Sequence, residues 1–363
     1  MHRPHPHSKA VRWLDSFGES ESVTRTTMND VARAAGVSMK SVSRVVNDEP
    51  NVTAKLRAKV EGAIATLGYV PDLAARSLAG GRSLTIGLLF GDHGDAFMPS
   101  YHPKAQSGAY RACRRAGYHL LVETIQTSGT DFSAEFEGML STMRTDGFVL
   151  PPPLADNIIV MEALEKRRIP FARIAPSIDL ARAPYVAMDD EAAAREMTQH
   201  LWSLGHRRIG FVSGRDDHPA AHRRRQGFVG ALADLGGHDF AEAGGQFQFD
   251  KGIEAAKTLM SSPTPPTAIF AANDDSAAGV MAGLAQLGLK IPDDVSVAGF
   301  DDSWIAQSVW PYLTTIHQPI AEMAEVAAAM LIEQNGAMKS KRAVTLDYHL
   351  VVRGSTALPK AAA

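Results

Sequence analysis

Apolar and polar residues follow two different patterns along this chain. Up to about residue 70, apolar residues recur at the spacing of one helix face. From residue 84 onwards, short apolar runs alternate with longer helical stretches. The first pattern predicts a small all-α unit, and the second is typical of a larger α/β unit with a parallel sheet.

Capping residues set the bounds of the first two predicted helices. Thr27 and Asp30 have the spacing of a capping box, which starts the first helix at the residue after the threonine. Gly36 can adopt a positive φ and is expected to end it. Ser38 is a good N-cap for a second helix that runs to about Asn47. One stripe of that helix is apolar and consists of Val42, Val45 and Val46.

The opposite face of the second helix carries hydrogen-bonding groups and one flexible apolar side chain. Its members are Met39, Lys40, Ser43, Arg44 and Asn47. Such a helix is slim enough to enter the major groove of DNA. The same spacing also fits an ordinary helical hairpin with a solvated polar face.

A third predicted helix favours the first of these alternatives. Thr53 is its expected N-cap, and Gly68 followed by Pro71 ends it. One face of this helix is lined by Leu56, Val60, Ala63, Ile64 and Leu67. Three short helices that share one small core are typical of a headpiece that reads DNA.

The second part of the chain predicts two α/β lobes in tandem. The expected strands are Leu84–Phe90, Leu120–Glu123, Gly147–Leu150, Phe171–Ile174, Arg208–Ser213, Ala268–Ala271, Val295–Gly299 and Thr345–Val351. The expected helices include Lys104–Ala116, Ser133–Arg144, Glu191–Leu204, Arg223–Leu235, Lys251–Met260 and Asp275–Gln286. Ligands of open parallel sheets bind beyond the carboxyl ends of the strands. Polar residues at those ends, which could bind a ligand or only cap a helix, are Asp92, Arg173, Arg215, Asn273 and Asp301.

Charge is distributed unevenly between the two parts. Met1 to Arg82 contain 12 Lys and Arg against 8 Asp and Glu, a net charge of +4, and the remaining residues contain 25 against 32, a net charge of -7. A basic first part on an acidic second part suggests that only the first part binds a polyanion. Chance variation of surface charge is the alternative.

Cysteine content and hydropathy bear on the compartment. Cys113 is the single cysteine, so no intramolecular disulfide can form, and a reducing cytoplasm is expected. A buried, unreactive role is expected for this thiol. The sequence has no apolar run of signal-peptide length near residue 1 and none that approaches 18 residues anywhere, so neither export nor a membrane span is expected.

Several runs in the first part carry a family resemblance. They are Thr27–Asn47, Val52–Arg57, Gly68–Asp72 and Ala75–Ala79, and together they closely resemble the lactose repressor (LacI) family. The resemblance implies that Met39, Lys40 and Arg44 face base edges of operator DNA. It places Ser38, Ser43, Asn47, Asn51 and Thr53 near phosphates or neighbouring base pairs. Arg44 is the expected bidentate partner of a guanine.

Asp72 to Ala79 form a separate short helix in this interpretation. Isolated helices shorter than about 12 residues are marginally stable in water, so this hinge should be frayed without DNA. The resemblance implies that two hinges pair across a dimer axis and that Leu78 wedges into a minor-groove base step. A plain linker whose leucine packs on the rest of the chain is the alternative.

The resemblance continues through the second part of the chain. Its runs are Leu204–Gly210, Arg224–Phe228, Ala272–Asp274, Gly299–Asp302 and Leu313–Pro319. It implies a periplasmic-binding-protein-like fold with two lobes joined by three crossovers. Arg224 and Asp301 would hold hydroxyl groups of a sugar ligand, Asn273 would assist, and Phe247 would cover the apolar face of the sugar. Asp92, at a strand tip, is a further candidate ligand residue.

This chain also departs from the family pattern at two places. After the strand Phe171–Ile174, where many members have an acidic pocket residue, it has Ala175 and Pro176. The run Gly91–Phe97 does not align securely with the family.

No motif for a metal, a nucleotide or a catalytic nucleophile is present in the sequence, so no cofactor, metal site or enzymatic activity is expected. The family resemblance implies a cytoplasmic, homodimeric repressor that binds pseudo-palindromic operator DNA and a small sugar. An exported sugar-binding protein and an α/β enzyme active on sugars or nucleotides are the alternatives. The C-terminus lacks a heptad repeat, so no coiled-coil tetramer is expected.

The predicted layout has five segments. They are a disordered extension (1–25), a helix-turn-helix domain (26–70), a hinge helix and linker (71–82), a ligand-binding and dimerisation domain (83–358) and a tail (359–363).

Overall fold

The structure is a computed structural model that describes residues 26–46, 49, 51–69, 82–92, 100–127, 131–237, 240–333 and 343–360, with only the backbone of Asp92. The chain divides into two compact units, Met1–Gly81 and Arg82–Ala363, called the head and the body below. The predicted extension at 1–25, the hinge helix with Leu78, and Asn47 lie outside the described residues.

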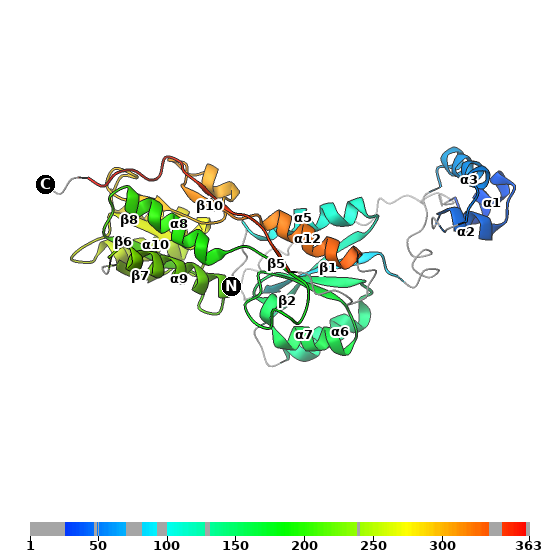
Figure 1. The fold of residues 1–363 in the computed structure, drawn as a ribbon, viewed down its shortest axis with the longest axis horizontal. Coiled ribbons are helices and arrows are strands. Elements are labelled where there is room, and N and C mark those ends of the chain that lie inside the picture. Colours follow the sequence, from blue (N-terminus) through cyan, green and yellow to red (C-terminus); the bar gives the residue numbers. More distant parts are fainter. Residues whose placement is uncertain are drawn as a thin grey trace, which may run out of the picture. The chain divides into compact units, whose positions relative to one another are not determined.

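The head contains the three helices that capping residues predicted. They are α1 (Met28–Ala35), α2 (Met39–Val46) and α3 (Ala54–Leu67) (Figure 1). The capping box forms, because the Asp30 amide donates to the Thr27 hydroxyl (3.3 Å) and the Thr27 amide donates to the Asp30 carboxylate (2.9 Å). Gly36 ends α1 with a φ of 61°. The helices enclose one core formed by Val31, Ala32, Ala35, Val42, Val45, Val60, Ala63 and Tyr69.

The body contains two parallel sheets, one in each lobe. Lobe 1 has a six-stranded sheet in the order β11-β5-β4-β3-β1-β2, and lobe 2 has a four-stranded sheet in the order β7-β6-β8-β9. A two-stranded antiparallel sheet, β10-β12, completes the body. The strands of the body are β1 (Thr85–Asp92), β2 (His119–Gln126), β3 (Gly147–Leu150), β4 (Phe171–Ile174), β5 (Tyr185–Ala187), β6 (Ile209–Ser213), β7 (Phe240–Gly244), β8 (Ala268–Ala271), β9 (Ser296–Ala298), β10 (Thr315–His317), β11 (Ala343–Thr345) and β12 (His349–Val351).

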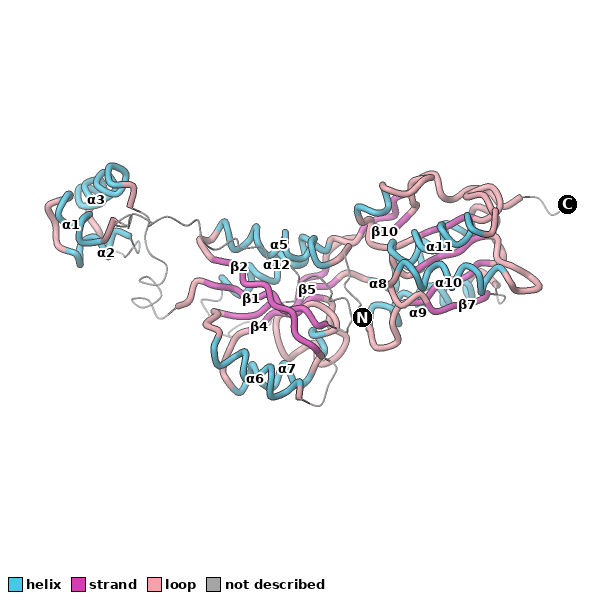
Figure 2. Tube along the Cα trace, turned by 180° about the vertical axis from the view of Figure 1, so that it is seen from behind, coloured by secondary structure: helices cyan, strands magenta, loops and turns pink. Residues whose placement is uncertain are grey.

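Helices cover these sheets. Figure 1 shows α5 and α12 over one face of the lobe 1 sheet and α6 and α7 over the other, and Figure 2 shows the same layers from behind. The body helices are α5 (His102–Arg115), α6 (Phe132–Thr142), α7 (Ile158–Lys166), α8 (Asp190–Ser203), α9 (Pro219–Asp234), α10 (Phe249–Met260), α11 (Asp274–Gln286) and α12 (Ile320–Glu333), and two 3-10 turns span Leu154–Asp156 and Trp304–Gln307. Strands buried on both faces explain the continuous apolar runs in the sequence.

The chain passes between the lobes three times. It leaves β5 for α8, returns from β10 to α12, and crosses again from β11 to β12. These are the three crossovers that the family resemblance implied. They place Asp190 and Gln318 at or beside the connections between the lobes.

The prediction of one strand over Thr345–Val351 is wrong. Residues on either side of Asp347 belong to different sheets, because β11 pairs with β5 and β12 pairs with β10. Five further elements, β5, β7, β10, α7 and α12, were not predicted from the sequence. Two of these strands, β5 and β10, contain three residues each, which is too short for a period to show in the sequence.

Candidate ligand pocket and DNA-reading helix

The second helix of the head presents the predicted polar face. Ser38 caps α2, since its hydroxyl accepts a hydrogen bond from the Ser41 amide (3.1 Å). Val42 and Val45 face the core, whereas Met39 and Lys40 are exposed. Ser43 is half-buried. Met39 and Lys40 therefore lie away from the core of the head, as residues of a recognition helix must.

Arg44 has partners within the head that sequence reasoning did not predict. Its Nη2 donates to the backbone oxygen of Asn51 (3.2 Å), and its Nε lies 3.5 Å from a carboxylate oxygen of Glu49. Asn51 itself has a φ of 68°. Thr53 caps α3 by accepting from the Leu56 amide (3.3 Å). These contacts place Glu49 and Asn51 beside the arginine.

One cavity of the body lies between the lobes and is called the inter-lobe pocket. Its lining residues are Tyr101, Pro152, Ala175, His218, Ala220, Arg224, Phe247, Asn273, Asp275, Asp301 and Gln318. Pro152 and Ala175 follow β3 and β4, and Asn273 and Asp301 follow β8 and β9. The pocket therefore lies beyond the carboxyl ends of strands from both lobes.

Four of the predicted ligand residues, Arg224, Phe247, Asn273 and Asp301, line this pocket together. The side chain of the fifth, Asp92, lies outside the described residues. Two further strand-tip candidates lie elsewhere. Arg173 is fully buried and donates to three backbone oxygens and to Asp156, and Arg215 pairs with Asp217.

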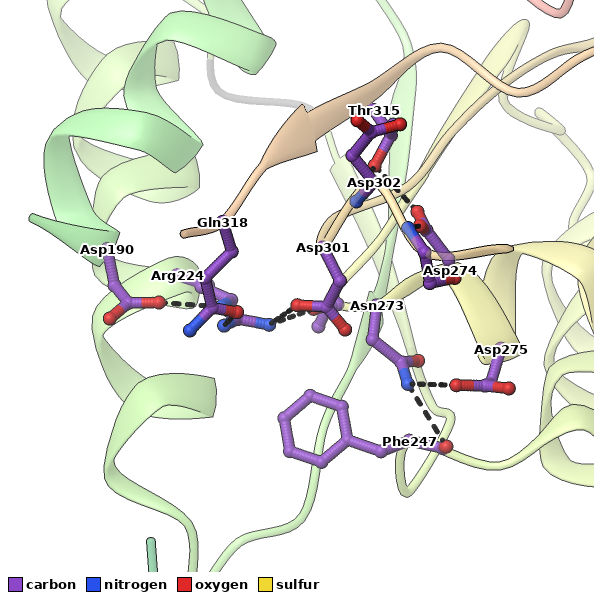
Figure 3. Close-up of polar contacts among 12 residues, drawn as sticks. Asp190, Arg224, Phe247, Asn273, Asp274, Asp275, Asp301, Asp302, Thr315 and Gln318 are labelled. Atoms are coloured by element: carbon purple, nitrogen blue, oxygen red, sulfur yellow. Dashed lines mark hydrogen bonds and ion pairs between the residues drawn. The ribbon is translucent and has the colours of Figure 1, made fainter. Parts of the chain in front are cut away.

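Arg224 is the centre of a buried network (Figure 3). Its Nε donates to Asp190 (2.9 Å), and its Nη2 donates to Gln318 (3.1 Å). Its Nη1 donates to the backbone oxygen of Ala272 (2.7 Å) and, more weakly, to Asp301 (3.5 Å). The guanidinium also stacks on the ring of Phe300, with its carbon 3.7 Å from the ring centroid. Hydrogen bonds at the edge of the guanidinium and the Phe300 ring on its face thus fix the arginine side chain.

Asn273 links the pocket wall to the start of α11. Its side-chain oxygen accepts from the amide and hydroxyl of Ser276, which makes it the N-cap of that helix. Its side-chain amide donates to the backbone oxygen of Phe247 (3.2 Å) and to Asp275 (3.4 Å) (Figure 3). Phe247 has a φ of 62°, and its ring lies against Gly214, where a β-carbon would clash with it. A glycine at 214 is therefore needed for the ring to take this position.

The carboxylates around the pocket differ in environment. Burial raises the pKa of Asp301, although the cationic side chains of Arg224 and Lys104 oppose that effect. Burial and the charge of Asp301 raise the pKa of Asp274, whose oxygens accept hydrogen bonds from Ser303 and Thr315. In contrast, a hydrogen bond from His317 lowers the pKa of Asp302, which faces away from Arg224.

Five polar residues of this region were not predicted from the sequence, namely Tyr101, Asp190, His218, Asp275 and Gln318. A signal existed for Gln318, which lies within the run Leu313–Pro319 that carried the family resemblance. Tyr101 lies just beyond the run that could not be aligned with the family, and the position of Asp275 in the first turn of α11 resembles an ordinary helix-start acid.

Two family profiles match the chain. Residues 27–72 match "Bacterial regulatory proteins, lacI family", and residues 198–356 match "Periplasmic binding protein-like domain". The head and the fold of the body are thus those of a DNA-binding regulator joined to a binding-protein-like unit.

Similar proteins span nearly the whole chain. The ribose operon repressor of Escherichia coli (strain K12) is 34% identical over 318 residues, which are 85% of this chain and 92% of the relative. The lac repressor dimer bound to operator and the anti-inducer ONPF superposes with a TM-score of 0.75 at 28% identity and covers 92% of this chain and 99% of its own. A complex of the transcriptional regulator CelR with cellobiose gives a TM-score of 0.67 at 28% identity and covers 91% and 100% of the two chains. The chain belongs to the lacI family of bacterial regulatory proteins, and it is a DNA-binding transcriptional regulator.

Proposed function

We propose that this regulator is a repressor whose operator affinity is controlled by a small sugar or sugar derivative bound in the inter-lobe pocket. The observation that carries this proposal is the meeting of Arg224, Asp301 and the ring of Phe247 at one pocket lined by both lobes. A guanidinium, a carboxylate and a ring face suit the polar and apolar sides of a sugar. The similar regulator CelR, whose complex contains cellobiose, supports the ligand class.

Control by the ligand follows from where the pocket lies. Tyr101 and Ala175 belong to lobe 1 and Arg224 to lobe 2, so a ligand that contacts all three favours one separation of the lobes. It changes DNA affinity only as far as it prefers one of the two states of the protein. The expected change is on the order of 5-fold to 150-fold in operator affinity.

The test measures operator binding with and without sugars. Fluorescence anisotropy of a labelled duplex from the promoter region is titrated with the full chain, in the presence of a panel of mono- and disaccharides. At least one sugar should change the dissociation constant for the operator without being turned over. Turnover of a sugar would instead support an enzyme, and sugar binding with no salt-sensitive DNA affinity would support a sugar-binding protein without a DNA role.

On the DNA side, we propose that the exposed face of α2 reads base edges through Met39, Lys40 and Arg44. Ser38, Ser43, Asn47, Asn51 and Thr53 would contact phosphates or neighbouring base pairs. Two heads would bind a pseudo-palindromic operator from a cytoplasmic homodimer, with Leu78 of each chain wedged into the minor groove. The similar lac repressor, which binds its operator as a dimer, supports the binding of operator DNA by a dimer.

Replacing Arg44 tests the role of α2. Arg44→Ala should lower the preference for operator over random duplex by about 10-fold to 100-fold, because one bidentate contact to guanine contributes about 1–3 kcal/mol of discrimination. Weak binding to random duplex should persist. Lys59→Ala removes the same charge from an exposed position on α3 and serves as the control. Equal loss of operator preference in both variants would contradict a reading role for Arg44.

A further inference from the structure

Three strong hydrogen-bond donors around the inter-lobe pocket, Arg224, Asn273 and Lys104, are used within the protein. All three nitrogens of Arg224 donate to protein acceptors. The side-chain amide of Asn273 donates to Phe247 and Asp275, and Lys104 donates to the backbone oxygens of Asp301 and Asp302. A ligand therefore meets few free donors on these three side chains.

Acceptors and negative charge remain on the pocket wall. Asp275 and Asp301 both line the cavity, and Arg224 is the single cation among its lining Lys and Arg residues in the described part of the chain. Asp190, which is 2% exposed, already uses the Nε of that arginine. The lining thus contains two carboxylates and one guanidinium, and burial raises the pKa of both Asp275 and Asp301.

Tyr101 is an independent sign of a ligand. Its side chain is 8% exposed and lines the pocket, yet within the described residues its hydroxyl has no hydrogen-bond partner. Buried tyrosine hydroxyls usually find a partner. A polar group supplied by a bound molecule would satisfy this hydroxyl from inside the cavity.

We propose that the ligand carries a protonated amine, as an amino sugar does, and that Asp275 is the carboxylate that selects it. This inference rests on the proposed function and narrows its ligand class. An ammonium group supplies three donors and no acceptor, which matches a wall rich in acceptors, whereas a neutral hydroxyl needs donors as well. The ring of Phe247 adds an attractive face for a cation.

The same wall should reject anionic sugars. A phosphate or carboxylate group would lie beside Asp275 and Asp301, and like charges in a buried site repel each other strongly. The two cationic side chains that could compensate, Arg224 and Lys104, already donate to protein acceptors. Selectivity is thus expected in the order amine, neutral sugar, anionic sugar.

Matched sugar sets test this order on the full-length chain. Each set holds one hexose skeleton in five forms: neutral, 2-amino, N-acetylated 2-amino, 6-phosphate and uronate. Isothermal titration calorimetry measures binding, and operator anisotropy measures the response, for gluco, galacto and manno skeletons. In one skeleton the free amine should bind about tenfold more tightly than the neutral and N-acetylated forms, the difference expected for one charge-assisted hydrogen bond.

Asp275→Asn is the decisive variant, because it removes the charge and keeps the size of the side chain. In this variant the dissociation constants of the free amine and the N-acetylated form should become nearly equal. Asp250→Asn, at an exposed site on α10, should leave the ratio of these two dissociation constants as in the wild type. A separate thermal melt checks that each variant folds.

The outcomes separate the two proposals. Equal or tighter binding of a neutral or anionic form, or an unchanged ratio in the folded Asp275→Asn variant, overturns the cationic ligand but leaves sugar control of DNA binding standing. If no form of any skeleton binds, the cationic ligand is overturned, and sugar control also fails if no member of the wider panel of mono- and disaccharides changes operator affinity.

Discussion

Single side chains in this protein carry charge where burial opposes it. Asp301 is 6% exposed, and its nearest cationic partner, Arg224, is shared with Asp190 and Gln318. An ionised carboxylate in such a place lowers the stability of the folded state unless a partner compensates it. In the ligand-free state, a site that binds a positively charged or donor-rich ligand is expected to contain a carboxylate that the protein compensates only in part.

The raised pKa of Asp301 predicts a pH dependence of stability. In the unfolded chain this carboxyl ionises at its ordinary pKa of 3.8, so the folded protein loses stability as the pH rises from there through the raised value. Asp301→Asn does not titrate and escapes this loss. The melting temperature of the variant minus that of the wild type should therefore be larger at about pH 8 than at about pH 5.

Thermal melts of the ligand-free proteins at both pH values measure this difference. Asp250→Asn controls for removal of an exposed carboxylate, and its difference from wild type should change little with pH. A pH-independent difference for Asp301→Asn, or one of opposite sign, would mean that burial does not dominate the titration of this residue.

Among the structural elements, closely packed helices depend on glycine. A β-carbon at Gly108 of α5 would overlap the backbone oxygen of Ala321 in α12, so these two helices can lie at their observed separation only if position 108 has no side chain. Gly138 of α6 is exposed and would have no atom within 4 Å of an added β-carbon. The same substitution thus has opposite consequences at the two positions.

Gly108→Ala should destabilise the body by about 1–3 kcal/mol or more, because the helices must move apart. Gly138→Ala should stabilise it by about 0.5–1 kcal/mol, because alanine loses less backbone freedom on folding. Urea denaturation followed by circular dichroism measures both. Similar stabilities for the two variants would show that α5 and α12 can separate at little cost.

How far sequence predicts an element depends on whether its determinants are local. The helices of the head were predicted closely because caps such as Thr27, Ser38 and Thr53 act within one turn. The short strands β5 and β10 are held by partners elsewhere in the chain, so their own residues carry little signal.

The candidate site divides in the same way. The family resemblance was enough to place four ligand residues in one pocket, namely Arg224, Phe247, Asn273 and Asp301. The balance between carboxylates and cations at this pocket could not be predicted from the sequence. It depends on Arg224 being engaged by Asp190, which lies 34 positions away in sequence and reaches it only through the first crossover. Asp275 looked like a helix-start acid because the favourable interaction with the helix dipole explains it equally well.

At the scale of the whole molecule, head and body have separate cores. The head core is built from α1, α2 and α3 alone, whereas the lobes are joined through crossovers and through the C-terminal segment. Ser355 in that segment is fully buried, and its hydroxyl donates to the backbone oxygen of Val297 and accepts from the Thr314 amide. The last residues of the body thus complete lobe 2. Among the described residues, no helix is both long and apolar enough to span a membrane.

Separate cores predict two unfolding transitions in calorimetry. Ser355→Ala should lower only the larger transition, by about 1–3 kcal/mol, because it leaves a buried amide and a buried carbonyl oxygen without this partner. Val42→Ala in the head core should lower only the smaller transition, by about 1.5 kcal/mol or more. Each variant acts as the control for the other. If both substitutions shifted one common transition, head and body would unfold as a single cooperative unit, and a ligand signal could then reach α2 through stability alone.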